Sequence, residues 1–142
     1  MNKKKEVIFK KARLAALDSD FHRQHVGCVI TYKGMPISTG SCSEKTHPYQ
    51  KIYNEYRYRQ APNDNEWMPK VHAEISALSK IKDLNLNPKK LAVYTYRIRK
   101  DQKFGMARPC PACINAIIDM GIKHIYYSTN DGYAHEILNL KI

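Results

Sequence analysis

The sequence lacks long apolar runs and dense cysteine patterns. No stretch approaches the roughly 20 apolar residues of a membrane span, and charges return at Lys10, Lys11 and Arg13 before any apolar stretch is long enough for a signal peptide. The four cysteines, at positions 28, 42, 110 and 113, do not form the framework of a small disulfide-bonded secreted domain. We therefore expect a cytoplasmic protein in a reducing compartment, with no membrane partner.

Acidic residues are scarce: 13 Asp and Glu stand against 24 Lys and Arg, which gives a formal charge of +11. Such an excess attracts phosphate-bearing partners, either free nucleotides or a nucleic acid, but it also arises when lysines only solvate the surface. The sequence has no internal repeat or low-complexity tract. With 142 residues, 43% of them hydrophobic, the chain fits a single domain over residues 1–142.

Apolar periodicity predicts helices and strands that alternate along the chain. The expected helices cover 4–17, 71–82 and a segment that starts at Cys110 and stops near Gly121. The expected strands cover 26–32, 36–39, 91–98 and 124–129, and the first two form a hairpin around Lys33 and Gly34. The segment 131–142 fits either a short helix or a final edge strand. This order favours an α/β fold with partly parallel strands.

The stretch 43–70 shows no sustained period and contains three prolines, which predicts a long loop with a binding or covering role. Its aromatic and basic side chains fit a clamp for a nucleotide. Alternatively, the tyrosines anchor the loop to the core while the arginines face water. The side chains concerned are Lys45, His47, Tyr49, Tyr53, Tyr56, Arg57, Tyr58 and Arg59.

The chemistry of the chain is concentrated in two short motifs. Cys110 and Cys113 lie one turn apart at a predicted helix start, where free N–H groups favour thiolates. Alone, this spacing fits metal binding, redox chemistry or two structural cysteines. His72, at the start of another helix, would complete a His-Cys-Cys set and leave a fourth position for water. Glu74 lies two residues later, within reach of such a water.

The His72-Ala73-Glu74 motif followed by Pro109-Cys110-Pro111-Ala112-Cys113 resembles the cytidine and deoxycytidylate deaminase superfamily. The likeness extends over almost the whole length. It implies a three-layer α/β/α cytidine deaminase-like sandwich with a mixed sheet of four or five strands, and a homo-oligomer. It also implies that His72, Cys110 and Cys113 bind Zn²⁺, while Glu74 moves protons.

The resemblance also suggests substrate contacts. Backbone groups beside the motif, the Ala73 N–H and the Arg108 carbonyl, become candidates for holding the exocyclic amine. Many relatives end the second hairpin strand in Gly-x-Asn, whereas this chain has Gly40-Ser41-Cys42, so Cys42 replaces a substrate-contacting asparagine. Further candidates are Lys45, His47, Arg57 and Arg59. Cys42 and His47 could contribute to a second zinc site, but two ligands are not enough to define one. Cys28 is expected to pack as a small apolar residue.

We therefore expect a zinc-dependent hydrolase of C–N bonds that converts a cytosine-type base to its uracil-type product, on a cytidine or deoxycytidine nucleotide. One alternative is deamination of cytosine or adenine in single-stranded DNA or RNA. Another is a noncatalytic zinc module in which a fourth ligand such as Cys42 closes the metal to water.

Overall fold

A computed structural model describes residues 2–20, 25–60, 70–99, 101 and 104–139, without the side chains of 57–60 and 104. Its described strands form one mixed sheet in the order β2-β1-β3-β5-β6. The bounds are β1 (His25–Tyr32), β2 (Met35–Ser41), β3 (Leu91–Ile98), β5 (His124–Thr129) and β6 (Gly132–Ile137), with the short β4 (Phe104–Gly105) paired to β3. Among the described strands, only β3 and β5 pair in parallel, and the other pairs are antiparallel. The predicted mixed sheet is confirmed.

Each edge of the sheet is formed by a strand that pairs with the strand before it in the sequence. Lys33 and Gly34 have φ values of 53° and 81°, and they reverse the chain between β1 and β2 as the sequence predicts. At the other end, β6 pairs antiparallel with β5 along its full length. The choice left open for segment 131–142 is therefore resolved in favour of an edge strand over Gly132–Ile137.

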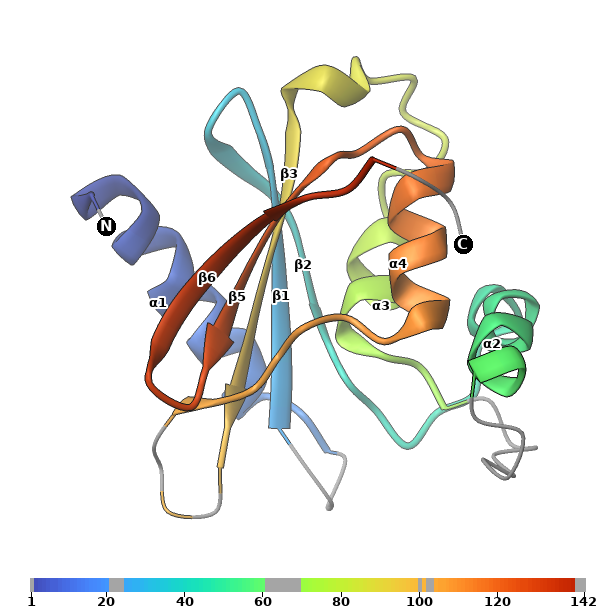
Figure 1. The fold of residues 1–142 in the computed structure, drawn as a ribbon, viewed down its shortest axis with the longest axis horizontal. Coiled ribbons are helices and arrows are strands. Elements are labelled where there is room, and N and C mark those ends of the chain that lie inside the picture. The colour runs from blue at the N-terminus through green and yellow to red at the C-terminus, as the bar shows by residue number, and fades with distance from the viewer. Residues whose placement is uncertain (1, 21–24, 61–69, 100, 102–103, 140–142) are drawn as a thin grey trace.

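Helices cover both faces of the sheet (Figure 1), which confirms the three-layer arrangement. Helix α1 (Lys3–Leu17) packs Ile8, Phe9 and Ala12 against one face. Helices α3 (Ala73–Ser79) and α4 (Pro111–Asp119) cover the other face, and a short 3-10 helix, η1 (Pro88–Lys90), precedes β3. Helix α3 is shorter than the predicted 71–82. No helix in the described ranges is long and apolar enough to cross a membrane.

Two glycines let helices approach the sheet closely. A Cβ on Gly27 would overlap the backbone of α1, and a Cβ on Gly40 would overlap the carbonyl of Ala73 and the amide of Ala77. Gly40 therefore permits close packing of α3 at the point where the His-Ala-Glu motif begins.

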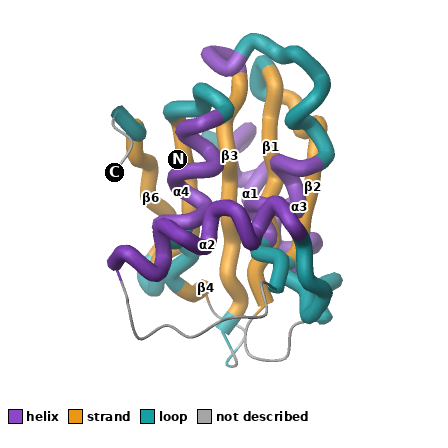
Figure 2. Tube along the Cα trace, turned by 90° about the vertical axis from the view of Figure 1, so that its right-hand side faces the viewer, coloured by secondary structure: helices purple, strands orange, loops and turns teal. Residues whose placement is uncertain are grey.

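The prediction of an irregular loop over 43–70 is wrong, because residues Pro48–Gln60 form a helix, α2. Pro48 suits a first helical turn, where no intrahelical N–H bond is lost. Among the described side chains of this helix, the two that are buried are the polar Gln50 and Asn54, one turn apart, with the partly buried Tyr49 and Tyr53 beside them. The inward face therefore lacks a clear apolar period. Figure 2 shows α2 outermost over α3 and α4.

Candidate metal centre

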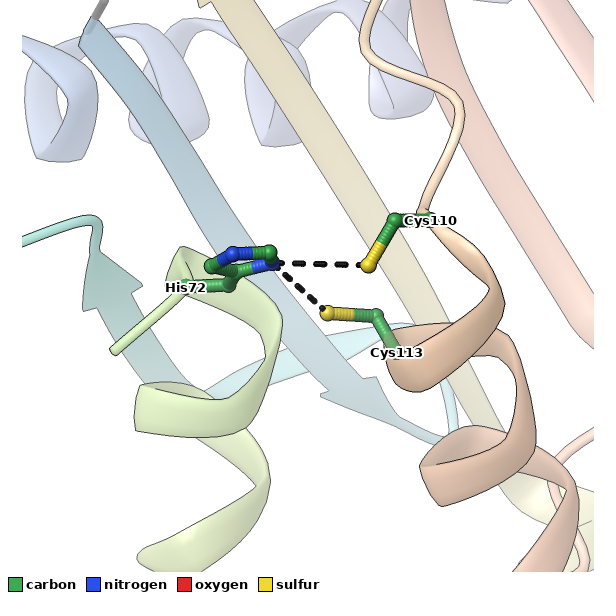
Figure 3. A group of neighbouring side chains, drawn as sticks. All are labelled: His72, Cys110 and Cys113. Carbon is green, nitrogen blue, oxygen red and sulfur yellow. Dashed lines mark hydrogen bonds between the residues drawn. The ribbon is translucent and has the colours of Figure 1, made fainter. Parts of the chain in front are cut away.

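His72, Cys110 and Cys113 meet where the N-termini of α3 and α4 converge (Figure 3). Nδ1 of His72 lies 3.5 Å from Sγ of Cys110 and 3.4 Å from Sγ of Cys113. A tetrahedral zinc with ordinary bond lengths separates nitrogen and sulfur ligands by about 3.5 Å. The spacing and the donor atoms therefore fit a zinc ion. Among the described residues, no other set of three or more His, Cys, Asp and Glu side chains could hold a metal.

Each helix start presents its residue in extended backbone. His72 is the N-cap of α3 with φ −82° and ψ 157°, and Cys110 is the N-cap of α4 with φ −70° and ψ 169°. Pro111 follows as the first helical residue, where its missing N–H costs nothing. Both helix N-termini thus face the centre, and their partial positive charge favours thiolates.

The segment before Cys110 is pinned to the sheet by buried hydrogen bonds. The Ala107 N–H donates to the Ser128 carbonyl at 2.9 Å, and the Thr95 hydroxyl donates to the Ala107 carbonyl at 2.8 Å. The Ser128 hydroxyl donates to the Gly105 carbonyl at 2.7 Å. The C-terminal end of the parallel β3–β5 pairing therefore fixes where α4 begins.

The two thiols differ in their environment. A hydrogen bond with Cys113 and the neighbouring His72 hold the pKa of Cys110 well below its ordinary value, against the effect of burial. Burial is the main reason that the pKa of Cys113 is raised. Cys110 is therefore the first of the pair to ionise, and a bound metal would draw both into the thiolate form.

Glu74 is buried beside these groups, with 5% of its surface exposed. Burial raises the pKa of its carboxyl group to about 7, although His72 and a hydrogen bond with Cys113 act in the opposite direction. Glu74 lies in the first turn of α3. A carboxyl group placed there can exchange a proton near neutral pH.

Cys42 lies apart from this cluster of ligands. Its Sγ accepts a hydrogen bond from the Val26 N–H at 3.3 Å and lies 3.0 Å from the Ser19 hydroxyl oxygen. The ring of His47 accepts from the Tyr49 N–H at 3.1 Å, at the start of α2. Neither residue belongs to the metal-binding set, and Cys28 is fully buried in the core as expected.

The remaining predicted contacts are spread along the chain. Ala73 is fully buried beside His72, and Lys45 is exposed. Arg108 is exposed, and its side chain binds Glu136 of β6. The side chains of Arg57 and Arg59 lie outside the described residues. Tyr49 and Tyr53 pack against the core, and the Tyr53 hydroxyl donates to Asp119 of α4, which agrees with the anchoring alternative for these two tyrosines.

Sequence reasoning missed Gln50. The His72 N–H donates to its Oε1 at 2.9 Å, and its Nε2 donates to Oδ1 of Asn54 at 2.8 Å. A signal for this contact was present in the sequence: Gln50 and Asn54 follow Pro48 and are four residues apart, which in a helix places both amides on one face.

Comparisons with known proteins point to a family with a zinc-binding region. The model of the family described as "Cytidine and deoxycytidylate deaminase zinc-binding region" matches residues 2–129. No curated protein sequence matches significantly.

Solved structures share the fold. Cytidine deaminase from Burkholderia pseudomallei has a TM-score of 0.63 at 15% identity, over 96% of this chain and 93% of that one. The dCMP deaminase of cyanophage S-TIM5, solved in apo form and with dCMP and dUMP, has a TM-score of 0.58 at 22% identity in the apo form, over 89% and 84%. Guanine deaminase from Bacillus subtilis has a TM-score of 0.52 at 22% identity, over 91% and 65%.

Proposed function

Because the chain belongs to the cytidine and deoxycytidylate deaminase zinc-binding family and is a zinc-dependent deaminase, a hydrolase of C–N bonds, we propose that its substrate is a cytidine or deoxycytidine nucleotide. The base would become the uracil-type product with release of ammonia. The observation that carries the proposal is the convergence of three zinc-type ligands beside the buried carboxyl group of Glu74.

In this proposal His72, Cys110 and Cys113 hold Zn²⁺. When bound, zinc lowers the pKa of a water ligand toward about 7 and so supplies a nucleophile at neutral pH. Glu74 would accept one proton from the attacking water and deliver it to the ring nitrogen of the base. It would then take the second proton from the hydroxyl group added to the base and pass it to the amino group, which leaves as ammonia while the carbonyl forms. Its burial excludes bulk water, and its place on α3 fixes its carboxyl group near His72.

The pattern of ligands supports a catalytic zinc over a structural one. A closed structural zinc needs four protein ligands, and the described metal-binding set has three. Cys42, the candidate for a fourth, directs its sulfur to Val26 and Ser19 instead.

For substrate contacts, the proposal keeps the Ala73 N–H and the Arg108 carbonyl for the exocyclic amine. Lys45, His47, Arg57, Arg59 and Cys42 stand as further candidates for the sugar and phosphate. Support for a phosphorylated substrate comes from the charge of +11 and from the nucleotides named with the phage dCMP deaminase.

The same proposal includes a single domain over 1–142, a cytoplasmic location and a homo-oligomer. One sheet joins all the described strands, which supports the single domain. All four cysteines are free, which supports a reducing compartment. The homo-oligomer is supported by the family alone.

The test is a mass-spectrometric panel of cytosine, adenine and guanine substrates, each as nucleoside, nucleotide, single-stranded DNA and single-stranded RNA. Deamination adds about 1 Da, and cytosine nucleotides should react fastest. Glu74→Gln should retain zinc and lose turnover, which separates chemistry from metal binding. Preferred reaction of a single-stranded polymer would replace the nucleotide proposal with the nucleic-acid alternative, which the charge also favours.

A further inference from the structure

Gln50 is a fully buried amide that contacts a proposed zinc ligand through the ligand's backbone. Its Oε1 accepts a hydrogen bond from the His72 N–H at 2.9 Å. His72 caps α3, so its N–H points away from the helix and has no intrahelical acceptor. Because the His72 N–H is partly buried, leaving it without an acceptor is costly, and its hydrogen bond to the fully buried Gln50 holds the His72 backbone in place.

The amide of Gln50 makes a second buried hydrogen bond. Its Nε2 donates to Oδ1 of Asn54 at 2.8 Å, and Asn54 is 2% exposed. If the Gln50 amide flipped, a donor would face the His72 N–H, so the His72 N–H itself selects the orientation of this amide. The two side chains therefore form a buried amide chain that ends on His72.

Helix α2 also contacts the helix that carries the cysteines. The Tyr53 hydroxyl donates to the carboxylate of Asp119 at 2.5 Å, and α2 packs against α4. Helix α2, which holds the His72 backbone through Gln50, is thus anchored to α4, whose N-cap is Cys110. A displacement of His72 by a fraction of an ångström would change its distances of 3.4 and 3.5 Å to the sulfurs.

We propose that Gln50 is a positioning residue for the metal ligand His72, and that Asn54 supports the Gln50 side chain through a buried hydrogen bond. This inference rests on the proposed role of His72, Cys110 and Cys113 as the zinc ligands. Groups that orient metal ligands typically change metal affinity by about 10-fold to 100-fold when they are removed.

The test replaces Gln50 by Met, which is similar in size and cannot accept the His72 N–H. The expected result for Gln50→Met is zinc binding about 10-fold weaker, measured by competition with a chromophoric chelator, and a shifted visible spectrum of the Co²⁺-substituted protein. Gln50→Glu keeps an acceptor for His72. Nδ2 of Asn54 has no hydrogen-bond partner among the described residues, so the Asn54 amide can turn and donate to the new carboxylate.

Gln50→Glu should therefore restore the wild-type Co²⁺ spectrum. Ser38→Ala is the matched control, because the Ser38 hydroxyl donates to the Ala77 carbonyl and anchors α3 away from His72. It should lower the melting temperature and leave the Co²⁺ spectrum unchanged. Unchanged zinc affinity and spectrum in Gln50→Met, with zinc bound by the wild type, would overturn the proposal. Failure of the wild type to bind zinc would instead refute the proposed zinc site on which it rests.

Discussion

The guanidinium of Arg108 donates two hydrogen bonds to the carboxylate of Glu136, at 2.6 and 3.2 Å. The Tyr127 hydroxyl donates to the same carboxylate at 2.7 Å. Arg108 lies two residues before Cys110, so this contact ties the edge strand β6 to the segment that leads into the metal centre. The hydrogen bond from Arg108 is the main reason that the pKa of Glu136 lies below its ordinary value.

Glu136→Gln should lower the free energy of unfolding at neutral pH. The loss should be at most about 1 kcal/mol, because both side chains of the pair are a third or more exposed. Since the pKa of Glu136 is lower in the folded protein, its contribution is present above about pH 4.5 and is lost as the pH falls through the folded-state pKa. Urea unfolding of both proteins at several pH values measures this, and a difference that grows under acid would contradict it.

Removal of zinc should destabilise the protein. Ligands that bind only the folded state add stability in proportion to the logarithm of their concentration over the dissociation constant. Treatment with a chelator should therefore lower the melting temperature, and added Zn²⁺ should restore it. Cys113→Ser should show little of this response, because it removes a buried thiolate from the proposed set. Scanning calorimetry with and without metal provides the measurement, and an equal response from Cys113→Ser would exclude Cys113 as a ligand.

Much of the fold was predictable because its helices and strands carry regular apolar patterns. Ile8, Phe9 and Ala12 recur at helical spacing and form one face of the core. Helix α2 was missed because Gln50 and Asn54 are buried through hydrogen bonds between amides, which a search for apolar periodicity does not detect. Strand β6 was ambiguous because edge strands have one solvent-facing side and short apolar patterns.

The candidate site, like the fold, was only partly predictable from the sequence. The resemblance of the two motifs to a known family was enough to predict that His72, Cys110 and Cys113 converge, and the structure brings the three side chains together. The residues that hold them in place were not predicted. The spacing of Gln50 and Asn54 places two amides on one helix face, but Gln50 and Ser128 contact backbone groups of distant segments, and nothing local in the sequence identifies those segments.

Ser19 and Cys42 should be energetically coupled. The Ser19 hydroxyl donates to the Cys42 carbonyl at 2.6 Å and lies 3.0 Å from its sulfur, and both residues are buried. Ser19→Ala and Cys42→Ala should each cost about 1–2 kcal/mol of stability, and the double variant should cost less than their sum. Urea unfolding of the four proteins gives the coupling energy. Because Cys42→Ala keeps the carbonyl, the cycle isolates the contact between the Ser19 hydroxyl and the Cys42 sulfur, and simple additivity would show that this contact does not contribute to stability.

His135 should make the protein less stable as the solution becomes mildly acidic. Partial desolvation of the exposed His135 ring lowers its pKa, and His124 and Lys5 lower it further by charge repulsion. Nδ1 of His124 lies 3.0 Å from Nε2 of His135, and the ring of Tyr126 stacks on His135. A neutral His135 therefore suits this environment better than a charged one.

The direction of this pH dependence follows from proton binding. Because the pKa of His135 is lower in the folded protein, the unfolded chain binds the proton more tightly. The free energy of unfolding therefore decreases as the pH drops below about 6.5, until the folded-state pKa is passed. His135→Gln should remove this component and keep all other titrating groups. The measurement compares urea unfolding of the two proteins at about pH 7.5 and about pH 5. A stability difference that does not change between these pH values would show that His135 does not contribute to the acid sensitivity.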